Sequence, residues 1–235
     1  MRIAILADIH GNLAALEAVV AELDRLRPDL VVHGGDLAVN GPRPTECVDL
    51  VRDRGWPGVV GNTDQALSAL PSELPENTRR AFQVLAPATA AMIGAERTRW
   101  LQTLPPVWRE GDRLALVHAV PGDTWRGLLP DTPDDVLTET YRPLRAAMVI
   151  YCHIHRPFLR DLGEFVLANT GSVGLPWDGD TRASYLWIED GKPDIHRVAY
   201  DIERHVAELE RSHYPARQWL IEQARTAAGG FVKLD

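Results

Sequence analysis

The chain has 235 residues, of which 45% are hydrophobic and 25% charged, a composition typical of a globular protein with a sizeable core. Its net charge of −8 argues against extended nucleic-acid binding, which needs a broad basic surface. The two cysteines, Cys47 and Cys152, lie far apart, so neither a disulfide framework nor a thiolate zinc site is indicated. No apolar run resembles a signal peptide or a membrane span, and we expect a cytoplasmic protein without membrane contact.

The first sixty residues repeat a strand followed by a helix. The branched apolar run 2–7 predicts a buried strand, and apolar residues at helical spacing follow it. Residues 28–36, PDLVVHGGD, predict a second strand, followed by a helix over about 44–54 with Thr45 as its cap. WPGVVGN, residues 56–62, predicts a third strand. This order indicates a parallel sheet whose functional loops lie at the carboxyl ends of the strands.

The rest of the chain changes character twice. Residues 64–104 are alanine-rich without strand signals and predict a helical excursion beside the sheet. Short strand-like runs then dominate, interrupted by a helix that starts at Thr132-Pro133. Two amphipathic helices divided by Pro215 are predicted over 201–228, where they either cap the sheet or form the contact of a homodimer. We therefore expect one α/β domain over 1–235.

Asp, His or Asn residues, whose side chains can bind metal ions, follow five of the predicted strands. Carboxylate, imidazole and amide oxygen suit divalent first-row metals such as Mn, Fe, Ni or Zn. Alternate residues of an extended segment point the same way, so each Asp-x-His or His-x-His pair brings two ligands to one place. The set is large enough for two ions, with Asp36 as the bridging candidate. The candidate ligands are Asp8, His10, Asp36, Asn62, His118, His153 and His155.

These residues carry a resemblance to the calcineurin-like metallophosphoesterases. The family blocks D-x-H, G-D, G-N-H-[DE], a lone H and G-H-x-H read here as Asp8-Ile9-His10, Gly35-Asp36, Gly61-Asn62-Thr63-Asp64, His118 and Cys152-His153-Ile154-His155. DIHGNLAAL, HGGDLAVNGPRP and NTGSVGLPWDGDTRASYLWI further resemble the small bacterial and archaeal branch of phosphodiesterases and diadenosine-tetraphosphatase-like proteins. The resemblance covers residues 1 to about 190.

The resemblance implies a four-layer α/β/β/α sandwich with two metals at its edge. One metal would be held by Asp8, His10, Asp36 and His155, and the other by Asp36, Asn62, His118 and His153. A hydroxide between the two ions would attack phosphorus in line. Asp36 and Asn62 are therefore the expected catalytic residues, with Asn62 and Asn12 donating hydrogen bonds to the phosphoryl group.

Two departures from the family pattern bear on the substrate. Thr63 replaces the histidine that serves as general acid in many relatives, and a hydroxyl of very high pKa cannot take that role. Leu175 and Trp177 stand where relatives often have Gln and Arg, which predicts a more apolar pocket wall. Trp125 and Trp177 are the tryptophans nearest the site loops, while Arg43 and Arg126 are candidates to bind a second phosphate.

The leading interpretation is a metal-dependent phosphodiesterase that acts on a small phosphorylated substrate, including nucleotides. Two alternatives remain open at this stage. One is a non-catalytic sensor that binds a metal or nucleotide at the same residues. The other is a protein phosphatase, which would need an open and shallow groove. His33, within the second strand, is expected to be a core histidine bonded to the backbone.

Overall fold

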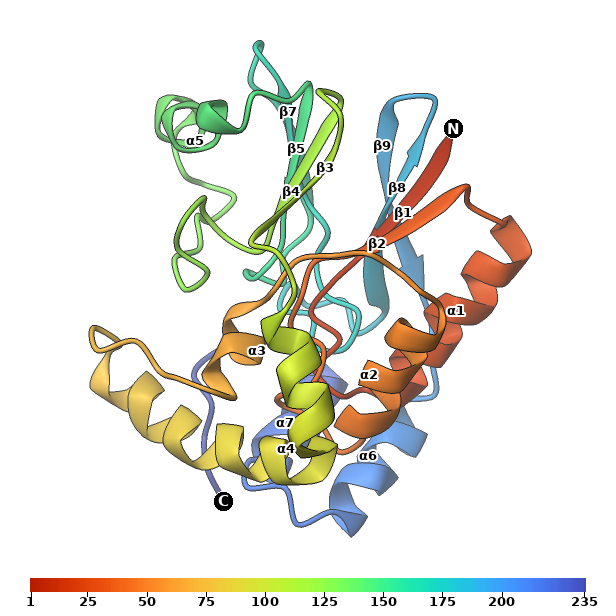
Figure 1. Ribbon diagram of the computed structural model, residues 1–235. Coiled ribbons are helices and arrows are strands. Elements are labelled where there is room, and N and C mark those ends of the chain that lie inside the picture. The colour runs from red at the N-terminus through yellow and green to blue at the C-terminus, as the bar shows by residue number, and fades with distance from the viewer.

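Two β-sheets form the centre of the computed structural model, which describes residues 1–235 (Figure 1). The first sheet has the strand order β2-β1-β8-β9. β1 pairs with β2 in parallel and with β8 antiparallel, and β8 and β9 form a hairpin. Its strands are β1 (Arg2–Leu6), β2 (Leu30–His33), β8 (Ala183–Glu189) and β9 (Lys192–Val198).

The second sheet has the order β3-β4-β5-β7-β6. β4, β5 and β7 run parallel to one another, whereas β3 and β6 pair antiparallel at the two edges. The three parallel strands therefore end at the same edge of the sheet. The strands are β3 (Val107–Glu110), β4 (Leu114–Val117), β5 (Met148–Tyr151), β6 (Phe158–Asp161) and β7 (Val166–Asn169).

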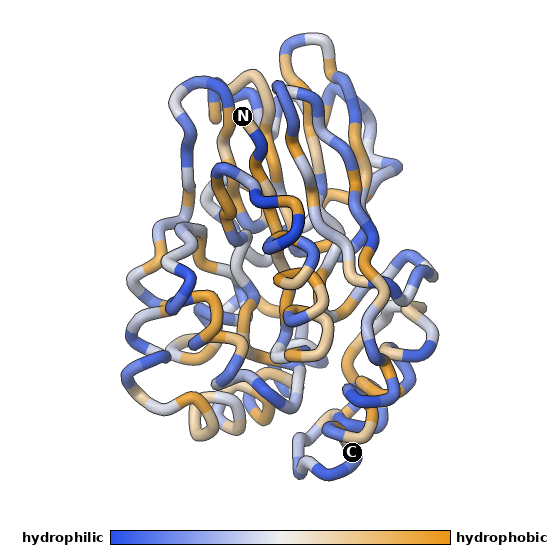
Figure 2. The backbone as a smooth tube through the Cα atoms, turned by 90° about the vertical axis from the view of Figure 1, so that its right-hand side faces the viewer, coloured by the Kyte–Doolittle hydropathy of each residue, from blue (hydrophilic) through white to orange (hydrophobic).

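The two sheets face each other through an apolar layer to which Ile5, Leu116 and Ile150 belong. Alternate residues point the other way: Leu6 packs with α1 (Leu13–Leu26) and α2 (Pro44–Asp53), while Tyr151 packs with α5 (Asp134–Tyr141) and the short 3-10 helix η1 (Arg142–Leu144). Apolar residues accordingly recur along the strands of both sheets (Figure 2). This arrangement confirms the α/β/β/α sandwich.

A second group of helices lies at the end of the sandwich where the parallel strands finish (Figure 1). Side chains of α4, α6 and α7 share one apolar cluster, and α3 also contacts α4. α4 continues through Pro87 and is interrupted at Gly94, where φ is 76°. The excursion and the C-terminal helices are thus present as α3 (Asn62–Ala66), α4 (Glu76–Gln102), α6 (Ile202–Arg211) and α7 (Arg217–Thr226).

Three local predictions differ from the structure. The third strand is reduced to one bridge between His33 and Gly58, because the chain beyond Val59 turns away and Val60 donates to Pro105 instead. The N-cap of α2 is Arg43, and the hydroxyl of Thr45 donates to Met92. α5 starts at Asp134 and Pro133 is its N-cap, so Thr132 does not cap it.

Two buried residues lie close to the site loops. His33 is buried as expected, but neither ring nitrogen has a hydrogen-bond partner, which corrects the prediction of a backbone bond. Cys152 is buried beside Gly34, and burial raises the pKa of its thiol, so it packs as a small apolar residue. None of the helices combines the length and apolar character that crossing a membrane requires.

Candidate metal centre and active site

The candidate ligands meet where parallel strands of the two sheets end. Asp8 and His10 follow β1, Asp36 follows β2, His118 follows β4, and His153 and His155 follow β5. Asn62 is the first residue of α3. Six of the seven residues are buried, and His153 is partly buried. The structure therefore brings together all seven predicted ligands from segments far apart in the sequence.

Left-handed backbone is unusually common among these residues. The φ angles of Asp8, His10, Asp36, His153 and His155 lie between 50° and 67°. Such a conformation costs about 1–3 kcal/mol for a residue other than glycine, and persists only where the surroundings enforce it. Here the backbone N–H of Asp8 donates to Gly35, and that of His10 donates to Asp36. The strain concentrates at the loops that position the candidate ligands.

Three imidazoles are held by the same kind of bond. Nδ1 of His10 lies 2.7 Å from the carbonyl of Val39, Nδ1 of His118 lies 2.7 Å from that of Gly34, and Nδ1 of His155 lies 2.6 Å from that of Leu175. A carbonyl only accepts, so we assign the proton to Nδ1 in each ring. In the neutral ring, Nε2 then carries a lone pair directed into the site, which suits a metal ligand.

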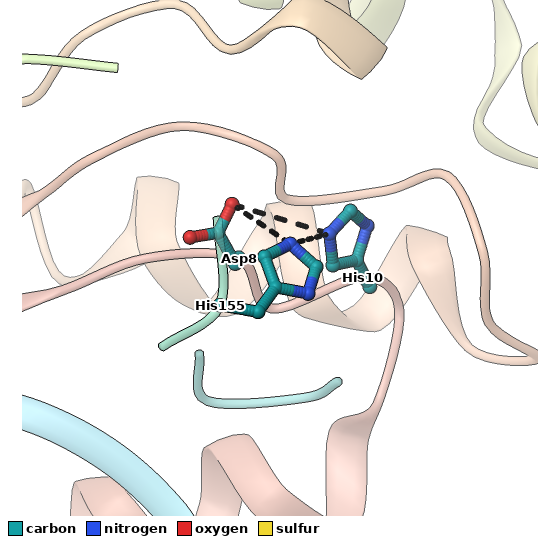
Figure 3. A group of neighbouring side chains, drawn as sticks. All are labelled: Asp8, His10 and His155. Carbon is teal, nitrogen blue, oxygen red and sulfur yellow. Dashed lines mark hydrogen bonds and ion pairs between the residues drawn. The ribbon is translucent and has the colours of Figure 1, made fainter. Parts of the chain in front are cut away.

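The first group of donors is drawn in Figure 3, where Asp8, His10 and His155 point toward one another. Nε2 of His10 and Nε2 of His155 are 3.1 Å apart, and Nε2 of His155 is 3.5 Å from Oδ1 of Asp8. Two facing lone pairs repel each other unless a cation lies between them. Oδ1 of Asp8 is buried and has no hydrogen-bond partner. These residues fit a divalent metal ion.

A second group of donors lies across the carboxylate of Asp36. Nε2 of His118 is 2.9 Å from Oδ1 of Asn62, and Nδ1 of His153 is 3.0 Å from the same oxygen. Oδ2 of Asp36 is 3.7 Å from Nε2 of His10, whereas its Oδ1 is 3.6 Å from Nε2 of His118. The carboxylate of Asp36 thus presents one oxygen to each group.

Burial shifts the pKa values of these groups in the direction that removes charge. It raises the pKa of Asp8 to about 7 and that of Asp36 to about 6, and it lowers the pKa of His10 and of His155 to about 4. The cost of burying charge thus falls on these two carboxylates and two imidazoles. A bound cation would stabilise the carboxylates and compete with protons for the imidazoles.

Asp64 has a structural role beside the candidate ligands. Its carboxylate accepts from the N–H of Gly61 at the start of α3. The same carboxylate also accepts from the N–H groups of Asp36 and Leu37. Asp64 thereby ties the loop after β2 to the loop before α3 and fixes the backbone of Asp36.

The comparisons with known proteins agree with this geometry. Residues 1–190 match the calcineurin-like phosphoesterase superfamily domain. The chain belongs to this superfamily. Like its other members it is a metal-dependent phosphoester hydrolase, and the Asp and His groups described above form its candidate metal site.

Individual proteins similar to this chain match almost its whole length. An uncharacterized protein of Methanocaldococcus jannaschii is 32% identical over 94% of this chain and 96% of its own length. The crystal structure of a metallophosphoesterase from Sphaerobacter thermophilus has a TM-score of 0.80 and 28% identity, and the match covers 97% of this chain and 100% of that one. A hypothetical protein from Pyrococcus horikoshii shares the fold, with a TM-score of 0.84, 19% identity and coverage of 97% and 98%.

A cavity of about 780 Å³ opens above the donor groups. We call its polar base, formed by His10, Asp36, Asn62, Thr63, His153 and His155, the floor. Trp125 and Trp177, expected near the site, both line the cavity, and the ring of Trp177 lies 4.4 Å from that of His155. Thr63 is buried and its hydroxyl has no partner.

The three residues predicted to bind substrate are not among those lining the cavity. Oδ1 of Asn12 accepts from Ala15 as the N-cap of α1, and its amide nitrogen donates to Gly174 and to Tyr200. Arg43 is engaged by Glu46 and by Glu208. Arg126 is exposed between two lining residues, Trp125 and Gly127. The cation that does line the cavity is Arg156, which was missed although it directly follows His155.

Proposed function

We propose that the protein is a dinuclear phosphodiesterase acting on a small phosphate ester. The observation that carries the proposal is the 3.1 Å approach of two unprotonated nitrogens, Nε2 of His10 and Nε2 of His155. Asp8, His10, Asp36 and His155 would hold one divalent ion, and Asp36, Asn62, His118 and His153 the other. Mn, Fe, Ni and Zn all accept this mixture of imidazole and oxygen ligands.

The metal ions would lower the pKa of a bound water and neutralise charge on the phosphoryl oxygens. The protein supplies orientation and burial. Carbonyl groups hold the three imidazoles in one orientation, and the N–H of Thr63 donates to Oδ1 of Asp36 over 2.9 Å. Because the donors are already placed, little reorganisation is needed when charge develops on the phosphate.

Thr63 and Arg156 support a diester with a good leaving group. The hydroxyl of Thr63 is free to donate a hydrogen bond, but its pKa is too high for it to protonate a leaving oxygen. Arg156 is the cationic side chain among the lining residues, and its Nε already donates to the carbonyl of Trp177. A diester brings one negative charge and a monoester up to two, so a site with one guanidinium favours the diester.

The shape of the cavity supports a small substrate over a phosphoprotein. Its volume lies within the range of roughly 300–1,000 Å³ typical of small-molecule sites. Residues of α4 and of the C-terminal segment stand over the floor, for example Phe82 and Phe231. A protein phosphatase needs a surface that a folded partner reaches, and these covering residues obstruct such an approach.

The test compares substrates on protein loaded with Mn, Ni, Zn or Fe. We expect metal-stimulated hydrolysis, faster for bis-p-nitrophenyl phosphate than for p-nitrophenyl phosphate. Binding is measured independently by calorimetry, which also counts the ions, and by thermal unfolding. Metal at 100 times its Kd stabilises by about 2.7 kcal/mol, which raises Tm by roughly 5–10 °C. Two bound ions without hydrolysis of any ester would favour the sensor, and one bound ion would contradict the dinuclear site.

A further inference from the structure

The cavity also has an apolar part that adjoins the metal ligands. We call it the wall, and it consists of Phe82, Trp125, Leu129, Trp177, Phe231 and Val232. The rings of Phe82 and Trp125 are 5.2 Å apart and nearly perpendicular, at 83°. The wall is continuous with the floor, since Trp177 contacts the ring of His155. A substrate whose phosphate rests on the floor therefore extends along aromatic rings.

Phe231 stands out because its side chain is 74% exposed although it lines the cavity. It belongs to residues 228–235, which we call the strap. At one end of the strap, Gly229 donates to Gln223 and lies against Trp177, where an added Cβ would come within 3.1 Å of that side chain. At the other end, Asp235 pairs with Arg217 over 3.2 Å. The strap is thus anchored on both sides of an apolar side chain that has no close packing of its own.

The polar groups near the wall are mostly neutral; the exception is Arg156, whose Nε donates to the carbonyl of Trp177. Asn40, Asn77 and Thr78 line the cavity, and Oδ1 of Asn40 is buried without a partner. Asn40 also has left-handed backbone, with a φ of 79°. Such a conformation persists mainly where the surrounding structure enforces it. Flat aromatic surfaces with neutral donors and acceptors at their edge suit an uncharged ring bearing polar substituents better than a flexible alkyl chain.

We propose that the wall binds an uncharged aromatic or heteroaromatic ring of the substrate, and that Phe231 packs on this ring from the strap. The inference rests on the proposed function, because the floor must hold the phosphate for the ring to reach the wall. Binding would bury the exposed ring of Phe231. An aromatic contact contributes roughly 2- to 12-fold in affinity beyond the effect of the area that it buries.

The experiment measures the affinity of phenyl phosphate and methyl phosphate for the metal-loaded protein by calorimetry. The two ligands share the phosphate and differ in the ring. We expect phenyl phosphate to bind at least tenfold more tightly, and Phe231→Ala to reduce this ratio roughly 5- to 10-fold. Phe231→Leu, which keeps apolar volume without the ring, should give an intermediate ratio. Leu234→Ala, also on the strap but outside the cavity lining, is the matched control and should keep the wild-type ratio.

The outcomes separate the ring site from the proposed function. Equal affinities of the wild-type protein for the two ligands overturn the ring site, even where diesters are hydrolysed normally. A ratio that Phe231→Ala leaves unchanged in the folded variant overturns the role of Phe231. If neither phosphate binds to the protein with both metals in place, the ring site fails, whereas the proposed function is decided separately by whether bis-p-nitrophenyl phosphate is hydrolysed.

Discussion

The floor and the wall of the cavity are held in place by different means. Four of the six floor residues have left-handed backbone, and hydrogen bonds fix the floor, as in the pairing of His10 with the carbonyl of Val39. Wall residues come from α4, the loop after β4, the loop between β7 and β8 and the strap. Phe82, Trp125 and Trp177 are held by packing in one apolar cluster, whereas Phe231 is exposed. Indole nitrogens of Trp125 and Trp177 have no hydrogen-bond partner at all. The floor, which would hold the phosphate, is therefore preorganised by hydrogen bonds. The wall, which would contact the rest of the substrate, consists of apolar side chains that other apolar side chains could replace.

The largest effect is expected from a floor residue. Asp36→Asn should lower kcat/KM by about 10³-fold, because the amide cannot replace the carboxylate that the two proposed cations would share. The side chain keeps its shape, and its Oδ1 still accepts from Thr63, so the fold should persist. Steady-state kinetics and circular dichroism check both expectations. Asp53→Asn, on the exposed side of α2, is the control and should keep wild-type activity. Comparable activity of the two variants would contradict the role of Asp36.

A smaller effect is expected from the backbone that supports the floor. In Gly61→Ala, the added Cβ would lie 2.0 Å from Oδ1 and 2.4 Å from the backbone nitrogen of Asp36. Relief of this clash should cost about 1–3 kcal/mol of unfolding free energy and displace Asp36, so that metal affinity falls as well. Urea unfolding and metal titration measure the two effects.

Gly111→Ala is the contrasting variant. Its added Cβ meets no atom within 4 Å, but its φ is 56°, so the expected loss is about 1–2 kcal/mol of stability alone. Metal affinity should not change, because Gly111 lies in the turn between β3 and β4. If both variants lower metal affinity equally, the floor does not depend on the close approach of Gly61 to Asp36.

The floor was predictable from the sequence, and the wall was largely not. The sequence shows two pairs of candidate ligands at alternate positions after apolar runs, Asp8 with His10 and His153 with His155. Parallel strands bring such loops to one edge of a sheet. Trp125 and Trp177 were found because they neighbour these loops. Phe231 was missed because it reaches the cavity through contacts such as that of Gly229 with Gln223 and Trp177, which no local pattern reveals.

Two of the residues predicted to bind substrate have other partners in the fold. Asn12 precedes an apolar helical pattern, and Asn is a favoured N-cap, so its capping role could have been inferred locally. Arg43 pairs with Glu46 three residues on, which is a local signal, but also with Glu208, which lies 165 residues away. Charged side chains near a predicted site are therefore assigned reliably only once their partners in the fold are known.

The smallest expected effect concerns the helices behind the wall. His205 is buried in α6, and burial lowers its pKa to about 4. Between pH 6.5 and 4 the unfolded chain binds more protons at this residue, so its contribution to stability, complete above pH 6.5, is lost as pH falls toward 4. This residue changes the unfolding free energy by at most about 1.4 kcal/mol per pH unit.

His205→Phe keeps a flat ring that does not titrate. It should reduce the pH dependence of the unfolding free energy by that amount, as measured by urea unfolding at pH 7 and pH 5. His213→Phe, at an exposed position, is the control. An unchanged slope in His205→Phe would mean that protons reach the helical cluster without unfolding it, and the wall would then be looser than its packing indicates.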